Sequence, residues 1–346
     1  MMLHAGWLLC VAAGIAAAQP RLVNAKVETQ ALQGSLDETF KHMVAAQADP
    51  AWIGYAVPVV PGDRSMCCYY SNSDSNYGYR GCSLEPRSPL PSANGGNAGP
   101  VLLEAPKNFY VMFRVERNEV TKLRTFSADC ELDAGGTTIH WLTGVRAADS
   151  VTLLASYQPT QSNALSAIAL HLDPSADAVL EKFLAPSEPE SVRRRTAVQM
   201  GQLRGRKGFE VLRGMMRDEK NERVRESAVQ GLAFSREPGA LEMVFSAAKS
   251  DPSIRIRGEA VSWLAREAGR KASGAIQEAI ESDPELSVKK KAVFALSQLP
   301  RDEGIPLLID VAKTNKNPEV RKQAMHWLGQ SHDQRALSFF EEVLSK

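Results

Sequence analysis

The sequence lacks an excess of charge of either sign. Its 41 Lys and Arg residues are offset by 40 Asp and Glu residues, which leaves a net charge of +1 at pH 7. A chain with this balance exerts no general attraction on the phosphates of nucleic acids. We therefore expect a partner other than nucleic acid.

Long hydrophobic runs are also scarce. The apolar run near the amino terminus, from Trp7 to Ala18, has twelve residues and is followed by polar sequence. A transmembrane helix needs about 20. Ala16 and Ala18 occupy the small-residue positions that precede a signal-peptide cleavage site. We therefore expect residues 1–18 to be a signal peptide. The mature chain is then exported, periplasmic or extracellular, and has no transmembrane segment.

Cysteine is rare, with five residues in the chain. Removal of Cys10 with the signal peptide leaves four: Cys67, Cys68, Cys82 and Cys130. An even number of cysteines in an oxidising compartment indicates disulfides. A bond between Cys67 and Cys68 would strain the peptide, so we expect each of them to reach Cys82 or Cys130, in either order. A four-cysteine zinc site is the alternative, although the usual paired C-x-x-C arms are missing.

The segment from 19 to 47 predicts a polar arm and one short helix. Residues 19–34 are polar and unpatterned. Ser35 to Glu38 forms a capping box, in which the serine hydroxyl accepts from the Glu38 amide, and an apolar stripe follows it. A helix over about 35–47 is expected.

Strand signals dominate the next hundred residues. Apolar runs rich in β-branched and aromatic residues predict strands at 52–60, 109–115, 122–130 and 137–145. Pro58 and Pro61 indicate that the first strand lies at a sheet edge. Gly135-Gly136 indicates a hairpin between the last two. We expect a small, mostly β domain over 48–155 with disulfides inside it. It contains a Ser/Asn/Gly/Pro-rich loop at 69–100.

Apolar residues recur every 32 positions in the second half of the chain. A leading β-branched residue is followed four positions later by a small one and eight later by a large one: Val192, Val224, Ile256, Val288 and Val320; Thr196, Ala228, Ala260, Ala292 and Ala324; Met200, Leu232, Leu264, Leu296 and Leu328. This spacing marks one face of a helix. A second set gives each unit a second helix: Leu212, Val244, Ile276, Leu308 and Phe340, then Met216, Ala248, Ile280, Ala312 and Leu344.

A less regular unit precedes these five, with Ala164, Ile168, Leu180 and Leu184 in the same phase. A single helix pair cannot bury its apolar stripe, so such units stack into a solenoid. The pattern Val-Arg-x-x-Ala-x-x-x-Leu, as in 224–232 and 320–328, resembles the short HEAT-like repeats of phycobilisome lyases. The resemblance covers about 160–346 and implies a right-handed superhelix of about six 32-residue repeats, with second helices on the concave side.

The HEAT-like fold does not imply one activity. Deoxyhypusine hydroxylase, an enzyme with such repeats, places iron on His-Glu dipeptides, and this sequence contains none. A bilin lyase acts on a cytoplasmic client, which the expected signal peptide argues against. His140 has no nucleophile or carboxylate pair beside it in the sequence. No catalytic residue, metal or cofactor is therefore expected.

Two rows of charge run through the repeats. The residue after each leading position is basic: Arg193, Arg225, Arg257, Lys289 and Arg321. We interpret this basic ladder as structural, with Glu219, Asp251 and Asp283 as natural partners. The second helices carry acids: Glu210, Glu242, Glu278, Asp310 and Glu342. This acidic row is either a solvated face or a groove that accepts a basic or polar peptide.

The predicted fold class is therefore α+β and multidomain, a small mostly-β domain with disulfides followed by an all-α HEAT-like solenoid. The favoured function is that of a non-catalytic exported scaffold that binds a protein or peptide through the solenoid surface. The alternative is a redox or metal-binding envelope protein centred on Cys67 and Cys68. A contact patch of aromatic residues near the cysteines is a third interpretation: Trp52, Tyr55, Tyr69 and Tyr70.

Overall fold

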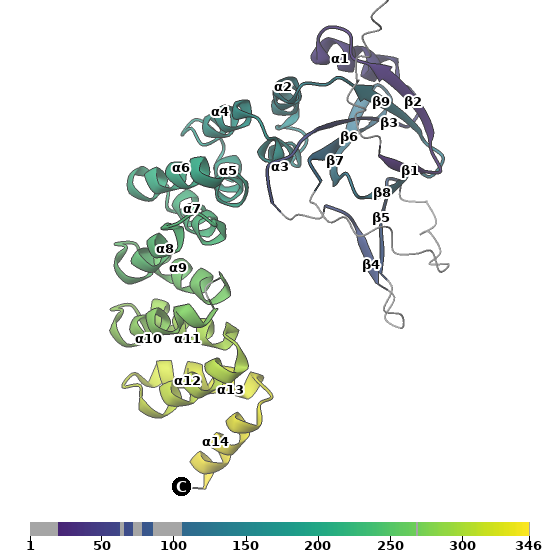
Figure 1. Ribbon diagram of the computed structural model, residues 1–346. Coiled ribbons are helices and arrows are strands. Elements are labelled where there is room, and N and C mark those ends of the chain that lie inside the picture. Colours follow the sequence, from purple (N-terminus) through teal and green to yellow (C-terminus); the bar gives the residue numbers. More distant parts are fainter. Residues whose placement is uncertain (1–19, 63–65, 72–77, 86–105, 268, 346) are drawn as a thin grey trace, which may run out of the picture. The chain divides into compact units, whose positions relative to one another are not determined.

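The computed structural model describes residues 20–62, 66–71, 78–85, 106–267 and 269–345 (Figure 1). The predicted signal peptide lies outside the described residues, as does most of the predicted loop at 69–100. The chain divides into two compact units, one formed by 1–167 with 171–173 and the other by 168–170 with 174–346.

The described residues of the first unit form two sheets and three helices. The larger sheet has the order β2-β9-β3-β6-β7, formed by Lys26–Ala31, Thr138–Thr143, Ala51–Pro58, Asn108–Glu116 and Glu119–Ser127. The smaller has the order β1-β8-β5-β4, formed by Arg21–Val23, Glu131–Asp133, Gly78–Ser83 and Tyr69–Ser71. The helices are α1, α2 and the start of α3, at Leu36–Ala46, Ala147–Tyr157 and Ala164–Leu170. The predicted α+β class is confirmed.

The long apolar run in β6 is explained by burial on both of its faces. Tyr110 and Met112 belong to a hydrophobic core to which both sheets contribute. Trp52, Trp141 and Cys130 are part of the same core. Phe109 and Phe113 point the other way. The Phe113 ring lies 4.7 Å from that of Phe40 in α1, and Phe109 contacts His171. A strand covered on both sides reads as continuously apolar instead of alternating.

Three expectations for this unit were wrong. The polar arm contains strands β1 and β2, and β2 pairs in parallel with β9 although all its residues are exposed. The strand at 51–58 lies in the middle of its sheet between β9 and β6, because Pro58 is its last residue and costs no ladder bond. Gly135-Gly136 joins β8 to β9, which belong to different sheets, so it is no hairpin.

A hairpin whose turn is described joins β6 to β7. Its turn residues Arg117 and Asn118 have φ values of 55° and 61°. Two positive φ angles characterise the two-residue type I′ turn, whose twist matches that of the strands. Asn118 was the available sequence signal, since asparagine adopts this conformation more easily than most residues.

The second unit consists of paired helices along the rest of the chain. The first helices of the pairs are α5, α7, α9, α11 and α13, at Glu190–Leu203, Glu222–Phe234, Ile254–Glu267, Leu286–Gln298 and Pro318–Gln330. The second helices are α6, α8, α10, α12 and α14, at Gly205–Asp218, Ala240–Ser250, Ser273–Ser282, Arg301–Thr314 and Gln334–Leu344. Helix α4, at Pro174–Phe183, precedes α5, and a short turn, Gly269–Ala272, precedes α10.

The repeating apolar positions form the core of this unit. Each first helix packs on the next first helix, and Figure 1 shows the first and second helices as two rows. The leading, small and large positions of all five first helices are buried. The last second helix departs from the pattern, because Phe339 is buried where Phe340 was expected and Leu344 is 85% exposed.

The junction of the two units lies later than the sequence suggests. A boundary between 155 and 160 was expected, whereas the first residues of α3, Ala164 to Ala167, belong to the first unit. Ala164 and Ile168, assigned to the less regular repeat, therefore fall on either side of the division.

Candidate functional site

The basic ladder of the first helices is bonded inside the solenoid. Arg193 pairs with Glu219, the Arg225 guanidinium lies 3.1 Å from the Asp251 carboxylate, and Arg257 donates twice to Asp283, at 2.7 and 3.1 Å. Each pair joins a first helix to the segment that begins the next unit. These acids are the three that the sequence offered as partners.

The same acids also accept hydrogen bonds in the turns that precede the following first helices. The backbone N–H of Ser253 donates to Asp251 at 2.8 Å, and that of Glu285 donates to Asp283 at 2.8 Å. One carboxylate therefore bonds both the arginine of one unit and the loop that leads into the first helix of the next. This double use was not visible in the sequence, where only the spacing of the acids could be read.

Lys289 and Arg321 depart from the pairing with acids. The position equivalent to Asp283 in the next unit is Asn315, which carries no charge. Lys289 instead donates to the carbonyls of Ile280 and Glu281, at 3.0 and 2.7 Å, and Arg321 donates to the Asn315 carbonyl at 2.8 Å. All five ladder residues thus have bonds of the kind that a structural role requires.

Much of the acidic row is neutralised by neighbouring cations. Glu278 lies 2.7 Å from Lys249 of the preceding unit, and Glu342 lies 2.8 Å from Lys313. Glu210 is held by two arginines of its own helix, Arg206 and Arg213. These pairs are partly exposed, so each contributes little to stability.

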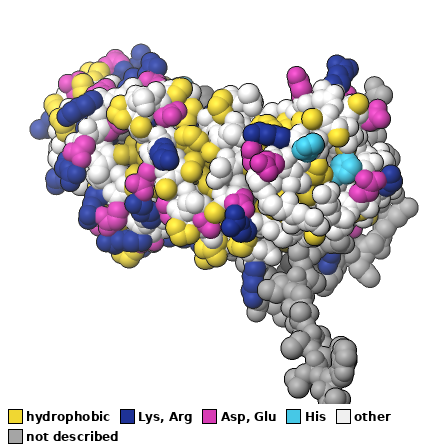
Figure 2. All heavy atoms as spheres, turned by 90° about the horizontal axis from the view of Figure 1, so that it is seen from above, with side chains coloured by type: hydrophobic (Ala, Val, Ile, Leu, Met, Phe, Trp, Pro, Cys, Tyr) yellow, Lys and Arg dark blue, Asp and Glu magenta, His cyan; other side chains and the backbone are white. Residues whose placement is uncertain are grey.

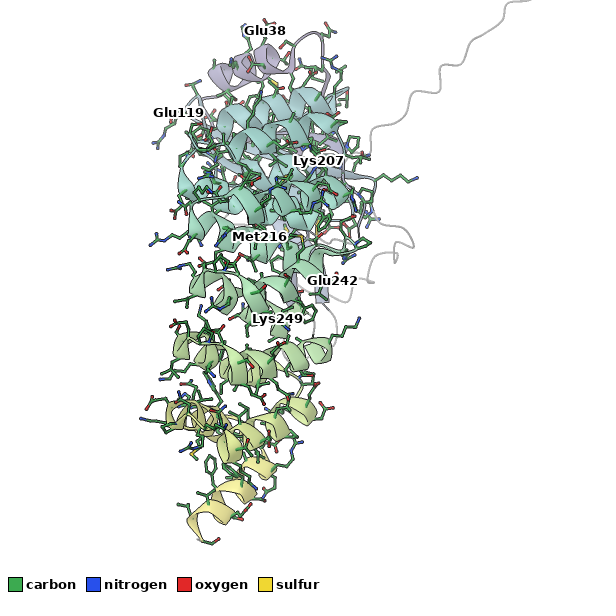
Figure 3. All side chains as sticks on the ribbon, turned by 90° about the vertical axis from the view of Figure 1, so that its left-hand side faces the viewer. Glu38, Glu119, Lys207, Met216, Glu242 and Lys249 are labelled. Atoms are coloured by element: carbon green, nitrogen blue, oxygen red, sulfur yellow. A yellow bond between two sulfur atoms is a disulfide. The ribbon has the colours of Figure 1, made fainter. Side chains whose placement is uncertain are left out.

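Glu242 and Asp310 differ from the other three acids, since neither forms an ion pair with another described residue. Both are exposed. Figure 3 looks onto the row of second helices and shows Glu242 and Lys249 on α8, with Lys207 and Met216 on α6. We call this exposed side the second-helix face, defined by Glu210, Glu242, Glu278, Asp310 and Glu342. Only two of its acids are left for an external cation.

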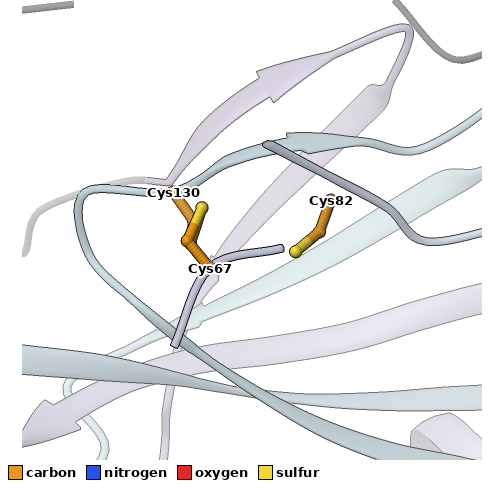
Figure 4. A group of neighbouring side chains, drawn as sticks. All are labelled: Cys67, Cys82 and Cys130. Carbon is orange, nitrogen blue, oxygen red and sulfur yellow. A yellow bond between two sulfur atoms is a disulfide. The ribbon is translucent and has the colours of Figure 1, made fainter. Parts of the chain in front are cut away.

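The cysteines form two disulfides, Cys67–Cys130 and Cys68–Cys82. Adjacent cysteines thus bond to separate partners, as predicted, and the open order of pairing is now assigned. The sulfurs of Cys67, Cys82 and Cys130 lie within 4.8 Å of one another (Figure 4). Cys82 and Cys130 are buried, and Cys67 and Cys68 are half-buried.

These sulfurs are the one group of three or more metal-ligating side chains among the described residues. Zinc is bound by thiolates, and a disulfide sulfur supplies none. The four-cysteine zinc site, which was the alternative, is therefore incompatible with the oxidised chain described here.

A buried chain of polar groups lies in the first unit and was not predicted. The Ser150 hydroxyl is 2.8 Å from Nε2 of His171 and 2.9 Å from the Tyr55 hydroxyl, and Nδ1 of His171 is 2.7 Å from the Ala167 carbonyl. The carbonyl requires a proton on Nδ1, so in the neutral imidazole Nε2 accepts from Ser150. Burial raises the pKa of Tyr55, which remains a donor. All three side chains are fully buried. The serine and the histidine therefore satisfy hydrogen-bonding groups inside the core and do not face a substrate.

Two of the four residues in the predicted aromatic contact patch are not at the surface, and the side chains of the other two, Tyr69 and Tyr70, lie outside the described residues. Trp52 and Tyr55 are fully buried. The Trp52 indole donates to Glu85 at 2.9 Å. Within the described part of the chain, no helix combines the length and the apolar character that a membrane span requires.

Comparison with known proteins agrees with the repeat geometry. Residues 176–265 and 273–346 match the family described as HEAT repeats. None of the curated proteins compared matches this chain.

Several solved structures resemble the chain at low identity. Human deoxyhypusine hydroxylase in complex with glycerol is 18% identical over 57% of this chain and 90% of its own, with a TM-score of 0.31. The complex of CpcE and CpcF of phycocyanin lyase from Nostoc is 21% identical over 45% and 99%, with a TM-score of 0.35. YibA of E. coli is 21% identical over 53% and 68%, with a TM-score of 0.37. These scores are below 0.5, so the assignment rests on the family match and the repeat: residues 176–346 are a HEAT-repeat solenoid.

Proposed function

We propose that the chain is an exported, non-catalytic scaffold that binds a basic or polar segment of a protein partner on its second-helix face. One observation carries the proposal. The basic side chains of the first helices are already bonded within the solenoid. The second-helix face is exposed, and its Glu242 and Asp310 form no ion pair with a described residue. Exposed acids along a rigid array can receive cationic side chains of a partner.

Export is supported by the two disulfides. Such bonds form and persist in secreted and periplasmic proteins and are rare in the cytosol. The apolar run at 7–18 is the sequence feature that agrees with it.

A protein partner is favoured over nucleic acid. Figure 2 shows Lys and Arg side chains interspersed with Asp and Glu side chains over the visible described surface. Nucleic-acid binding requires a basic patch or stripe to replace counterions. The net charge of +1 agrees with the mixed surface.

The test uses the full chain as bait for proteins of its native envelope fraction. In the variant Glu242→Lys/Asp310→Lys we expect recovery of the partner to fall by about tenfold, since two favourable contacts become repulsive. The matched control is Glu278→Gln/Glu342→Gln, which removes two acids of the same face that are already neutralised internally. Recovery should stay near that of the unaltered chain.

Equal recovery with the reversed and unaltered chains would exclude the second-helix face as the contact. Equal loss in both variants would show that the face binds through its overall charge and not through Glu242 and Asp310. Thermal unfolding of each variant shows whether the solenoid is intact.

A further inference from the structure

The four cysteines are closer together than two independent cross-links require. Three sulfurs that belong to two different disulfides lie within 4.8 Å of one another. Adjacent residues, Cys67 and Cys68, supply one sulfur to each bond. Disulfides exchange when a thiolate attacks a neighbouring disulfide sulfur, so a thiolate released from one bond already lies beside the other.

The surroundings favour attack at Cys68. Its side chain is half-buried, whereas its partner Cys82 is 2% exposed. Nη2 of Arg124 lies 3.6 Å from the Cys68 sulfur, and the same guanidinium donates to the Ser83 carbonyl at 2.7 Å and stacks over the Phe126 ring. A fixed cation beside an accessible sulfur attracts an incoming thiolate and stabilises negative charge there.

The sulfur that leaves in this attack, that of Cys82, also has a hydrogen-bond donor beside it. The backbone N–H of Cys68 points at the Cys82 sulfur, at 2.8 Å. This donor can stabilise the thiolate that forms on Cys82. The Ser127 hydroxyl lies 3.7 Å from the Cys130 sulfur and can do the same for Cys130.

We propose that this cluster is a thiol–disulfide exchange centre that an external thiol opens at Cys68. The external thiolate bonds to the Cys68 sulfur, the Cys68–Cys82 bond breaks, and its electron pair leaves on Cys82. The Cys82 thiolate then attacks the Cys67 sulfur. A Cys67–Cys82 bond forms, the Cys67–Cys130 bond breaks, and the electron pair leaves on Cys130, which takes a proton from water.

A second external thiolate completes this single exchange. It attacks the external sulfur held on Cys68, forms an external disulfide and releases the Cys68 thiolate. The two external thiols are then oxidised to one disulfide by loss of two electrons. The chain has gained those electrons: it now holds one disulfide, Cys67–Cys82, and two thiols, on Cys68 and Cys130. The partner chemistry is therefore an accessible thiol, and the activity is independent of the solenoid surface proposed above.

The full chain can be tested with reduced glutathione in the absence of oxygen and with a chelator to exclude metal. Samples are quenched with acid, alkylated and mapped by mass spectrometry. We expect glutathione on Cys68 first, and then a Cys67–Cys82 bridge that the starting protein lacks. Glutathione on Cys67 first, retention of Cys67–Cys130 while Cys68 and Cys82 become alkylated, or no reaction would each overturn the proposal.

Arg124 is a positioning residue in this scheme. Arg124→Met should slow the first step roughly fivefold, the effect of one charge about 4 Å away in a largely aqueous setting. Arg124→Lys should restore much of the rate. Lys122→Met is the matched control, since it removes an exposed cation two residues away in β7 and should leave the rate unchanged. Equal rates for the unaltered chain and Arg124→Met would remove Arg124 from the mechanism.

Discussion

At the scale of single residues, we expect the ion pairs of the solenoid to contribute to stability according to their burial and not their number. Arg257 and Asp283 are each 8% exposed, and two hydrogen bonds join them. Arg223 and Glu190 form an exposed pair at 3.6 Å. Loss of one partner leaves an uncompensated buried charge in the first case and a solvated charge in the second.

Arg257→Met is expected to lower the free energy of unfolding by about 2 kcal/mol. This is below the range for fully buried pairs, because both side chains still touch solvent. Urea unfolding followed by circular dichroism measures the change. Arg223→Met serves as the control and should not change the urea concentration at the midpoint of unfolding. An equal shift in the two variants would show that burial does not distinguish the pairs.

The buried tyrosines predict a pH dependence. Burial raises the pKa of Tyr110 from 10.0 to about 12 and raises that of Tyr55 as well. The folded state thus favours the protonated phenol. The contribution that this difference in pKa makes to the free energy of unfolding is fully present below about pH 10, the pKa in the unfolded chain. It is lost as the pH rises through about 12, the pKa of Tyr110 in the folded chain. Absorbance at 295 nm should show these tyrosines ionising later in the folded chain than in 6 M guanidinium chloride, as judged against Tyr55→Phe and Tyr110→Phe. Coincident titration curves would contradict the prediction.

At the scale of elements, the close approach of neighbouring first helices depends on glycine. A Cβ added to Gly201 in α5 would lie 2.0 Å from the Gly231 carbonyl oxygen in α7. Backbone cannot move aside as a flexible side chain can. The helices can touch at this distance only because neither position carries a side chain.

Gly201→Ala is therefore expected to destabilise the solenoid by about 2 kcal/mol through overpacking, although alanine is the better helix former. Gly214→Ala in α6 is the matched control, because nothing lies within 4 Å of the added Cβ. It should stabilise the fold by up to about 1 kcal/mol. Chemical denaturation of both variants tests the pair, and a stabilising Gly201→Ala would show that α5 and α7 separate easily.

At the scale of the whole molecule, the disulfides and the repeats belong to different compact units. All four bonded cysteines lie in the first unit, and the Cys67–Cys130 bond joins residues 63 positions apart. A solenoid is stabilised by contacts between neighbouring units and owes nothing to a distant cross-link.

Reduction should therefore destabilise the first unit selectively. Loss of a cross-link of this length is expected to cost about 4 kcal/mol. Scanning calorimetry should show two transitions, of which a reductant lowers only the one assigned to the sheets. Circular dichroism at 222 nm, dominated by the solenoid helices, should keep its midpoint. A common shift of both transitions would mean that the two units unfold together.

The sequence by itself determined the solenoid, because its contacts are local and repeat. Val224, Ala228 and Leu232 specify one helix face, and the same face recurs every 32 residues, so five agreeing registers predict both helices and core. The partners of Arg193, Arg225 and Arg257 could be named for the same reason.

In the first unit the sequence predicted α1 and the strands β3, β6, β7 and β9, but tertiary structure alone decided how the strands pair, because that pairing is non-local. Strand β2 is wholly exposed and carries no apolar signal, yet it pairs with β9 more than a hundred residues later. Backbone hydrogen bonds leave no mark on side-chain pattern, so neither this pairing nor the central place of β3 could be read from composition. Spacing could not choose between the two disulfide orders either, because only the folded sheets bring Cys130 to Cys67 and place Cys82 beside both.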